Sequence, residues 1–173
     1  MGGFLGQVAK LLGAGKVLGT VGNPEKAKLA ASFGYDELFV RSEFAEKTLK
    51  STGQKGVHAV FDPVGGSMRK QSLEVLCPLG QLVVVGNASG EEDVSHSFNQ
   101  IWFSNKQSAG FTLGGYAESN PTETGKAARE ALSMLARKEI HAEIHGVYPL
   151  EKAAEALTLL EQKNTVGKLV LKV

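Results

Sequence analysis

The chain has 173 residues, with 19 Lys and Arg against 18 Asp and Glu and a formal net charge of +1. This length suffices for one domain with a sizeable core, and interspersed charges of both signs argue against a nucleic-acid partner. The longest apolar runs, such as residues 81–86, are far shorter than the ~20 residues of a membrane-spanning helix. The lone Cys77 can form no disulfide within the chain, which is typical of a reducing compartment. We therefore expect a cytoplasmic protein that binds a small molecule, with no nucleic acid and no membrane as partner.

Strand and helix patterns alternate along the first two thirds of the chain. Apolar residues recur at helical spacing over residues 2–12 and predict a helix there. The predicted strands cover residues 16–22, 38–40, 57–62, 81–90 and 108–115, and the predicted helices between them cover 24–34, a segment from 42 and a segment ending at 76. Val-rich strands that alternate with helices predict a parallel sheet covered on both faces. The predicted fold class is therefore doubly wound α/β.

The last third of the chain has a different pattern. It predicts a helix over 121–138, an extended stretch over 139–150, a helix over 150–163 and a strand over 167–173. Because no Pro- or Ser-rich linker divides the chain, we expect one domain over residues 1–140 with a C-terminal extension over 141–173.

Glycine gathers where the predicted strands end. The strand exits read Gly22-Asn23, then DPVGG over 62–66, then GNASG over 86–90. In open α/β sheets ligands bind at the carboxyl ends of the strands, where helix N-termini converge, and glycine lets a ligand lie against the backbone. These exits predict a ligand cleft, although glycines that only form tight turns would give the same pattern.

The residues after the strand over 16–22 favour one dinucleotide over another. An acidic residue at this place accepts the ribose hydroxyls of NAD, but here Gly22-Asn23 follows the strand, and Lys26 lies one helical turn further on. A lysine there attracts a 2′-phosphate, so the pattern favours NADPH. Glu25 argues against this interpretation, and a solvated helix lysine is the alternative role of Lys26.

Residues with their own chemistry are sparse. His141, Glu143 and His145 would share one strand face, but zinc sites gather three or four ligands and no further Cys or His is near in sequence. We therefore expect no metal site. Since no Ser/His/Asp or Cys/His arrangement stands out, we expect a cofactor-binding chain with no catalytic acid or base of its own.

Four segments together resemble a known family. They read GQVAKLLGAGKVLGTVGNPEKAKLA, GVHAVFDPVGG, GQLVVVGNASG and YPLEKAAEALTLLEQKNTVGKLVL. Their order and spacing are similar to those of the cofactor-binding half of the medium-chain dehydrogenase/reductase superfamily, most of all its zinc-independent NADPH:quinone oxidoreductase branch. The resemblance implies a Rossmann-type domain, NADPH as cofactor, hydride transfer to a quinone or an α,β-unsaturated carbonyl, and a homodimer.

The resemblance also implies roles for individual residues. Asn23 and Lys26 would meet the 2′-phosphate, and Arg41 follows Val40 at a position where the family usually has a tyrosine near the adenosine. The cofactor-binding residues that it implies, together with those from the strand exits, are Gly2, Gly22, Asn23, Lys26, Arg41, Val64, Gly86, Asn87, Lys163, Gly167 and Lys168. Val64, Gly86 and Asn87 would contact the riboses. Lys163, whose role comes from the resemblance alone, would reach a phosphate near Gly167 and Lys168.

The resemblance departs from the family at the front of the chain. Family members carry a GroES-like domain, then the first Rossmann strand and a Gly-rich turn, and Met1-Gly2 matches only the end of that turn. We therefore expect an N-terminally truncated Rossmann domain, a fragment that is inactive alone. The alternatives are a mis-assigned start at an internal methionine and another segment or chain in the place of the strand. On this interpretation Gly3 and Gly6 are helix residues that allow close packing on the sheet.

Two other functions remain open at this point. One is a non-catalytic NADPH-binding module, which would bind the cofactor without turnover. The other is half of a zinc-dependent alcohol dehydrogenase relative, whose metal ligands would lie in the other half. The lack of an acidic residue after the strand over 16–22 weakens the second, since many zinc enzymes use NAD.

Overall fold

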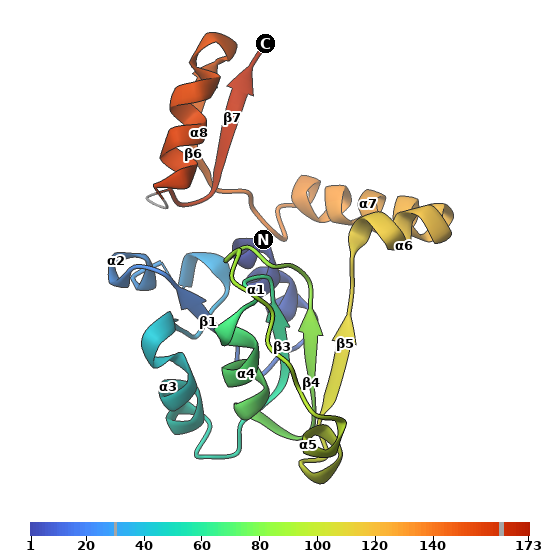
Figure 1. Ribbon diagram of the computed structural model, residues 1–173. Coiled ribbons are helices and arrows are strands. Elements are labelled where there is room, and N and C mark those ends of the chain that lie inside the picture. The colour runs from blue at the N-terminus through green and yellow to red at the C-terminus, as the bar shows by residue number, and fades with distance from the viewer. Residues whose placement is uncertain (30, 163–164) are drawn as a thin grey trace. The chain divides into compact units, whose positions relative to one another are not determined.

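The computed structural model describes residues 1–29, 31–162 and 165–173 (Figure 1). The chain divides into two compact units. The first unit contains Met1–Arg41 and Arg129–Val173, and the second contains Ser42–Ala128. Helix α7 (Pro121–Ala136) begins in the second unit and ends in the first.

The first unit contains two short parallel strand pairs. Its elements are α1 (Gly2–Leu11), β1 (Leu18–Val21), α2 (Pro24–Ala27), the 3-10 turn η1 (Ala31–Phe33), β2 (Glu37–Val40), β6 (Ile144–Pro149), η3 (Leu150–Lys152), α8 (Ala153–Glu161) and β7 (Lys168–Lys172). Strand β1 pairs with β2, from Leu18 opposite Glu37 to Val21 opposite Val40. Strand β6 pairs with β7. Both pairs are parallel, and the alternating pattern predicts this for β1 and β2.

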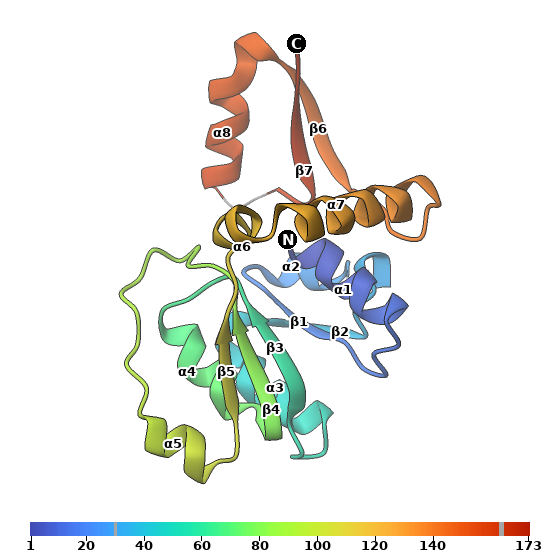
Figure 2. The ribbon, with the colours of Figure 1, turned by 90° about the vertical axis from the view of Figure 1, so that its right-hand side faces the viewer.

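The second unit is built on a three-stranded parallel sheet of order β3-β4-β5, whose strands lie side by side in Figure 2. Its elements are η2 (Arg41–Glu43), which starts one residue before the unit, α3 (Phe44–Ser51), β3 (Val57–Asp62), α4 (Ser67–Glu74), β4 (Leu76–Val84), α5 (Phe98–Phe103), β5 (Gln107–Gly110) and α6 (Leu113–Ser119). The core of this unit lies between α4 and the sheet. It contains the buried side chains of Leu73, Leu76 and Leu82, of which Leu82 is only 2% exposed.

Local caps explain where two of the helices begin. The Asn23 side chain accepts a hydrogen bond of 2.8 Å from the Glu25 N–H, and Pro24 occupies the first helical position of α2. Ser97 and Gln100 form a reciprocal capping box at the start of α5. Each cap satisfies N–H groups that have no partner within the helix.

Several predicted boundaries are wrong. The helix predicted over 24–34 is shorter, because α2 ends at Ala27 and a separate 3-10 turn covers 31–33. The strand predicted over 108–115 ends at Gly110, because its partner β4 ends at Val84, the residue opposite Gly110. Strand β4 begins at Leu76 instead of 81, since Leu76 pairs with Val57 before the register shifts. The pattern did not predict α5, which lies between the strands predicted over 81–90 and 108–115.

Among the described residues, no helix combines the length and the apolar character that crossing a bilayer requires.

Asp36 joins three segments of the first unit. Its carboxylate accepts hydrogen bonds from Lys10 Nζ at 2.7 and 2.9 Å and from the Val17 N–H at 2.6 Å. These bonds connect the end of α1, the approach to β1 and the start of β2. They favour the ionised carboxylate, and the hydrogen bond from Lys10 is the largest cause of a pKa for Asp36 below its ordinary value.

The lowered pKa predicts a pH-dependent contribution to folding. Stability from a carboxylate of lowered pKa is complete above the unfolded pKa, about 3.9, and is lost as the pH falls through the folded pKa. The Asp36→Asn variant should therefore be less stable than the wild type at pH 6, and this difference should shrink as the pH approaches 2. Urea midpoints over this range measure the difference.

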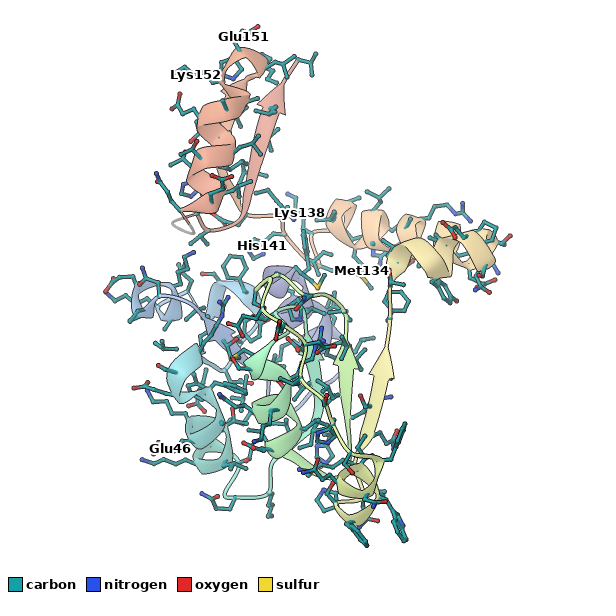
Figure 3. The ribbon with its side chains drawn as sticks, in the orientation of Figure 1. Glu46, Met134, Lys138, His141, Glu151 and Lys152 are labelled. Atoms are coloured by element: carbon teal, nitrogen blue, oxygen red, sulfur yellow. The ribbon has the colours of Figure 1, made fainter. Side chains whose placement is uncertain are left out.

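Glu151→Gln is the matched control, because Glu151 is exposed on η3 of the same unit (Figure 3). A difference between wild type and Asp36→Asn that is constant from pH 6 to pH 2 would contradict the role of the Asp36 carboxylate.

Candidate functional site

A cavity of about 210 Å³ lies within the first unit. Segments from both ends of the chain line it: the start of α1, the end of β1, the first turns after β1, and the loop before β7. Its lining residues are Met1, Gly2, Gly3, Phe4, Thr20, Val21, Lys26, Leu29, Phe33, Tyr35, Leu38, His141, Glu143, Thr165, Val166, Gly167 and Lys168.

The N-terminus of α1 opens into this cavity. Gly2 and Gly3 form its first turn and both line the cavity. Their N–H groups have no acceptor within the helix, and neither Met1 nor the first turn supplies a carboxylate or hydroxyl that could cap them. The positive end of the helix dipole and these N–H groups favour an anion at this position.

Two lysines add positive charge to the same cavity. The Lys26 ammonium donates a hydrogen bond of 2.9 Å to the Thr165 carbonyl and thereby connects the helix after β1 to the loop before β7. Burial, and secondarily the nearby charge of Lys168, lower the pKa of the Met1 amino group. Glu143 is the one acidic side chain among the lining residues. The cavity thus combines a helix N-terminus with lysines, which is a combination suited to a phosphate group.

The first helix approaches its neighbours closely because it carries glycine there. A Cβ atom at Gly6 would overlap the Phe33 carbonyl oxygen, and one at Gly3 would lie 2.9 Å from the Phe33 ring. The Tyr35 hydroxyl donates a hydrogen bond of 2.6 Å to the Gly2 carbonyl. Gly3 and Gly6 therefore allow close packing of α1, as expected, but against residues 33–35 rather than against a strand.

The same helix holds the segment that follows α7. The Gln7 side chain accepts from the His141 N–H at 2.8 Å and donates to the His141 carbonyl at 3.1 Å. The His141 ring, labelled in Figure 3, stacks on Phe33 with centroids 5.9 Å apart. These contacts join residues that are more than a hundred positions apart and complete one wall of the cavity.

Gly167 shapes the loop on the other side of the cavity. Its φ is +89°, a backbone conformation that residues other than glycine rarely adopt. A Cβ there would overlap the Glu143 carbonyl oxygen. The Lys168 N–H donates to that carbonyl at 2.8 Å. Glycine at 167 thus lets the loop enter β7 next to residue 143.

In the second unit, the turns after β3 and β4 are joined to each other. The N–H groups of Ala88 and Ser89 donate to the carbonyls of Pro63 and Val64 at 3.0 and 2.8 Å. The Asn87 side-chain oxygen fills the space next to Gly65, where a Cβ would overlap it. The predicted residues of these turns, among them Val64, therefore form one hydrogen-bonded surface at the carboxyl edge of the sheet.

The predicted site residues divide between the two units. Gly2, Lys26, Gly167 and Lys168 line the first-unit cavity. Val64, Gly86 and Asn87 lie on the turns of the second unit. Lys163 lies outside the described residues.

Three predicted residues of the first unit lie outside the cavity lining. The Asn23 oxygen is occupied as the cap of α2. The Arg41 guanidinium lies 3.9 Å from the place of a Cβ at Gly22, so these two residues are neighbours. Neither Arg41 nor Gly22 lines the cavity. Their predicted role in cofactor binding therefore requires that the cofactor extend beyond the cavity.

Sequence reasoning missed Tyr35, Thr165 and Arg69. The sequence holds only a weak signal for Tyr35, which is that this aromatic residue directly follows a glycine. In the structure that glycine, Gly34, has a positive φ. Thr165 and Arg69 carried none, because their partners Lys26 and Asp62 lie in other elements. Over the described parts of the chain, no cluster of three or more His, Cys, Asp or Glu side chains is placed to hold a metal ion.

Comparisons with known proteins match nearly the whole chain. The family model described as zinc-binding dehydrogenase matches residues 1–137. A quinone oxidoreductase of Pseudomonas aeruginosa is 36% identical over an alignment that covers 99% of this chain and 53% of the relative. A 2-haloacrylate reductase of a Burkholderia species is 28% identical, with 99% of this chain and 52% of the relative covered.

Solved structures give the same result. The crystal structure of Escherichia coli quinone oxidoreductase complexed with NADPH matches with a TM-score of 0.85 and 30% identity. The match covers 99% of this chain and 53% of that chain. The α/β class that the strand and helix pattern predicts, and the Rossmann-type domain that the resemblance implies, are thereby confirmed. This chain spans about half the length of the curated relatives that it matches.

The packing at Gly6 predicts a specific sensitivity to side-chain volume. Gly6→Ala should lower the free energy of unfolding by about 1–3 kcal/mol, because the added methyl group forces α1 away from the Phe33 backbone. Gly15→Ala is the control, since nothing lies within 4 Å of a Cβ at that position, and its effect should stay within about 0.5 kcal/mol. Urea denaturation measures both variants. Equal effects at the two positions would contradict the close contact.

Proposed function

Because this chain belongs to the zinc-binding dehydrogenase family, as the cofactor-binding half of a medium-chain dehydrogenase/reductase, we propose that it binds NADPH for an oxidoreductase. The reaction that we propose is hydride transfer to a quinone or to an α,β-unsaturated carbonyl compound. The chain alone would bind the cofactor and would be inactive in catalysis. The cytoplasm and a homodimer are the setting and assembly that we propose for the protein.

The first-unit cavity is the observation that carries this proposal. It combines the uncapped N-terminus of α1 with the lysines at positions 26 and 168. The donors fit phosphate groups: backbone N–H groups of a helix N-terminus bind phosphate oxygens, and ammonium groups neutralise their charge. No carboxylate directly follows β1, where an NAD-binding domain would place one. Lys26 would accordingly meet the 2′-phosphate that distinguishes NADPH from NADH.

The remaining predicted residues would orient the cofactor. Gly2 lets a phosphate approach the backbone at the start of α1, and Arg41 beside Gly22 offers a further cation. Val64, Gly86 and Asn87 would contact riboses through the turns of the second unit. When bound, NADPH supplies the hydride, and these residues hold its reactive ring in place.

The names of the relatives support the proposed substrate class. The curated relatives include quinone oxidoreductases, a 2-haloacrylate reductase and an acryloyl-coenzyme A reductase. Quinones and acrylates share an electron-poor carbon–carbon double bond conjugated to a carbonyl or carboxyl group, so one hydride-transfer chemistry serves both. We propose an acceptor of this kind. The division into a domain over 1–140 and an extension over 141–173 also remains a proposal.

The cofactor assignment predicts a selective effect at Lys26. Lys26→Ala should weaken NADPH binding about tenfold, the loss of one charge-assisted hydrogen bond, and leave NADH binding nearly unchanged. Lys28→Ala is the matched control, because Lys28 lies at the end of the same helix and pairs with Glu25. Isothermal titration of both cofactors against each protein measures the effect. An equal loss for NADPH and NADH would count against a 2′-phosphate contact.

The activity is tested on the polypeptide encoded by the whole open reading frame that contains this sequence. It should oxidise NADPH in the presence of a benzoquinone or an enone, followed by absorbance at 340 nm. Cofactor binding without oxidation by any acceptor would favour the non-catalytic module instead.

A further inference from the structure

One partly buried arginine contacts the segments that follow β3 and β4 in the second unit. Arg69 lies in the first turn of α4, and its side chain is only 13% exposed. Its guanidinium meets three oxygen groups from three places in the chain: the Asp62 carboxylate, the Gly86 carbonyl and the Asp93 carboxylate. A buried guanidinium is costly unless such partners surround it.

The first partner shapes the turn after β3. Asp62, whose side chain is 3% exposed, ends that strand, and its Oδ1 accepts hydrogen bonds from the N–H groups of Val64 and Gly65 at 2.8 and 3.0 Å. Its Oδ2 lies 3.5 Å from Arg69 Nε. Neither of these last two atoms has a hydrogen-bond partner among the described residues. The two buried charges therefore depend on each other.

The other two partners belong to the turn after β4. Arg69 Nη2 donates to the Gly86 carbonyl at 3.0 Å, and Nη1 pairs with Asp93. That hydrogen bond is the largest cause of a lowered pKa of the Asp93 carboxyl. Because the guanidinium is planar and rigid, its ion pair with Asp62 and its hydrogen bond to Gly86 restrict the distance between the two turns, in addition to the backbone hydrogen bonds that join them.

We infer that Arg69 is a positioning residue for the cofactor: together with the backbone hydrogen bonds from Ala88 and Ser89, it fixes the spacing of the turns after β3 and β4. Ligands of open parallel sheets lie against the carboxyl ends of neighbouring strands, so a ligand that touches both turns depends on their spacing. Lysine cannot replace arginine here, because a single ammonium cannot reach the Asp62 carboxylate and the Gly86 carbonyl in the same directions. The inference rests on the proposed NADPH binding.

The test compares Arg69→Lys with Arg137→Lys. The control arginine is half-exposed and pairs with Glu130 and Glu139 in the other unit, so it undergoes the same chemical change away from both turns. Asp93→Asn is the second variant. It removes only the negative charge of the outer partner, whose side chain is 65% exposed, so it weakens the same arrangement without burying an unpaired charge.

Two measurements on the whole chain read the effect. Hydrogen–deuterium exchange, followed by NMR without ligand, reports the N–H groups of Val64 and Gly65. Isothermal titration compares NADPH with 2′,5′-ADP, which lacks the nicotinamide mononucleotide half and therefore cannot make the contacts of both riboses.

Arg69→Lys should accelerate exchange at Val64 and Gly65 at least tenfold. It should weaken NADPH about tenfold or more and leave the affinity for 2′,5′-ADP within twofold. Asp93→Asn should also accelerate the exchange and weaken NADPH binding, but by less. Arg137→Lys should change neither the exchange nor the NADPH affinity.

Unchanged exchange in Arg69→Lys would overturn the positioning role whether or not the chain binds NADPH. Equal weakening of NADPH and 2′,5′-ADP would overturn it too, since that result indicates general destabilisation. A wild-type chain that binds neither compound would refute the proposed function, and with it the role of Arg69 toward the cofactor. In that case accelerated exchange would still show that Arg69 holds the turn after β3.

Discussion

The close approach of α1 to residues 33–35 is the constraint on which the first-unit cavity depends. It requires the absence of a side chain at Gly6, because any Cβ there would overlap the Phe33 carbonyl oxygen. With the helix at this distance, Tyr35 reaches the Gly2 carbonyl, and Gln7 binds the backbone of His141. The helix N-terminus is thereby aimed into the cavity. Its partial positive charge serves an anionic ligand only because packing elsewhere in the unit holds it there.

In the second unit, the glycine-rich turns must be held in one conformation. Glycine allows a ligand to lie against the backbone but increases the conformational entropy that folding must overcome. Here a carboxylate and a guanidinium, both largely buried, supply the missing order: Asp62 binds two N–H groups of its own turn, and Arg69 joins it to the Gly86 carbonyl. A charged pair with directional bonds specifies a geometry that apolar packing alone would leave undefined.

Much of the fold follows from local pattern. Strand β3 and helix α1 agree with prediction to within a residue, because an apolar run with a glycine exit and a helical repeat with a terminal glycine are signals contained in neighbouring residues. The errors occur where a neighbouring strand determines the end of an element. The end of β5 at Gly110 reflects the end of its neighbour β4, and the early start of β4 reflects a register shift against β3. Neither boundary can be predicted from the residues at that boundary alone.

The sequence by itself determined the α/β class and the glycine-rich strand exits. It also determined that no carboxylate directly follows β1 and that Lys26 lies one helical turn further on. Each of these is a property of adjacent residues. Only the tertiary structure decided that Thr165, Gly167 and Lys168 line one cavity with Gly2 and Lys26. It also decided that Arg69 lies between the turns that follow two different strands. The physical reason is the same in both cases. Contacts between distant segments arise from the packing of whole elements, and packing depends on shape and register, which local composition does not encode.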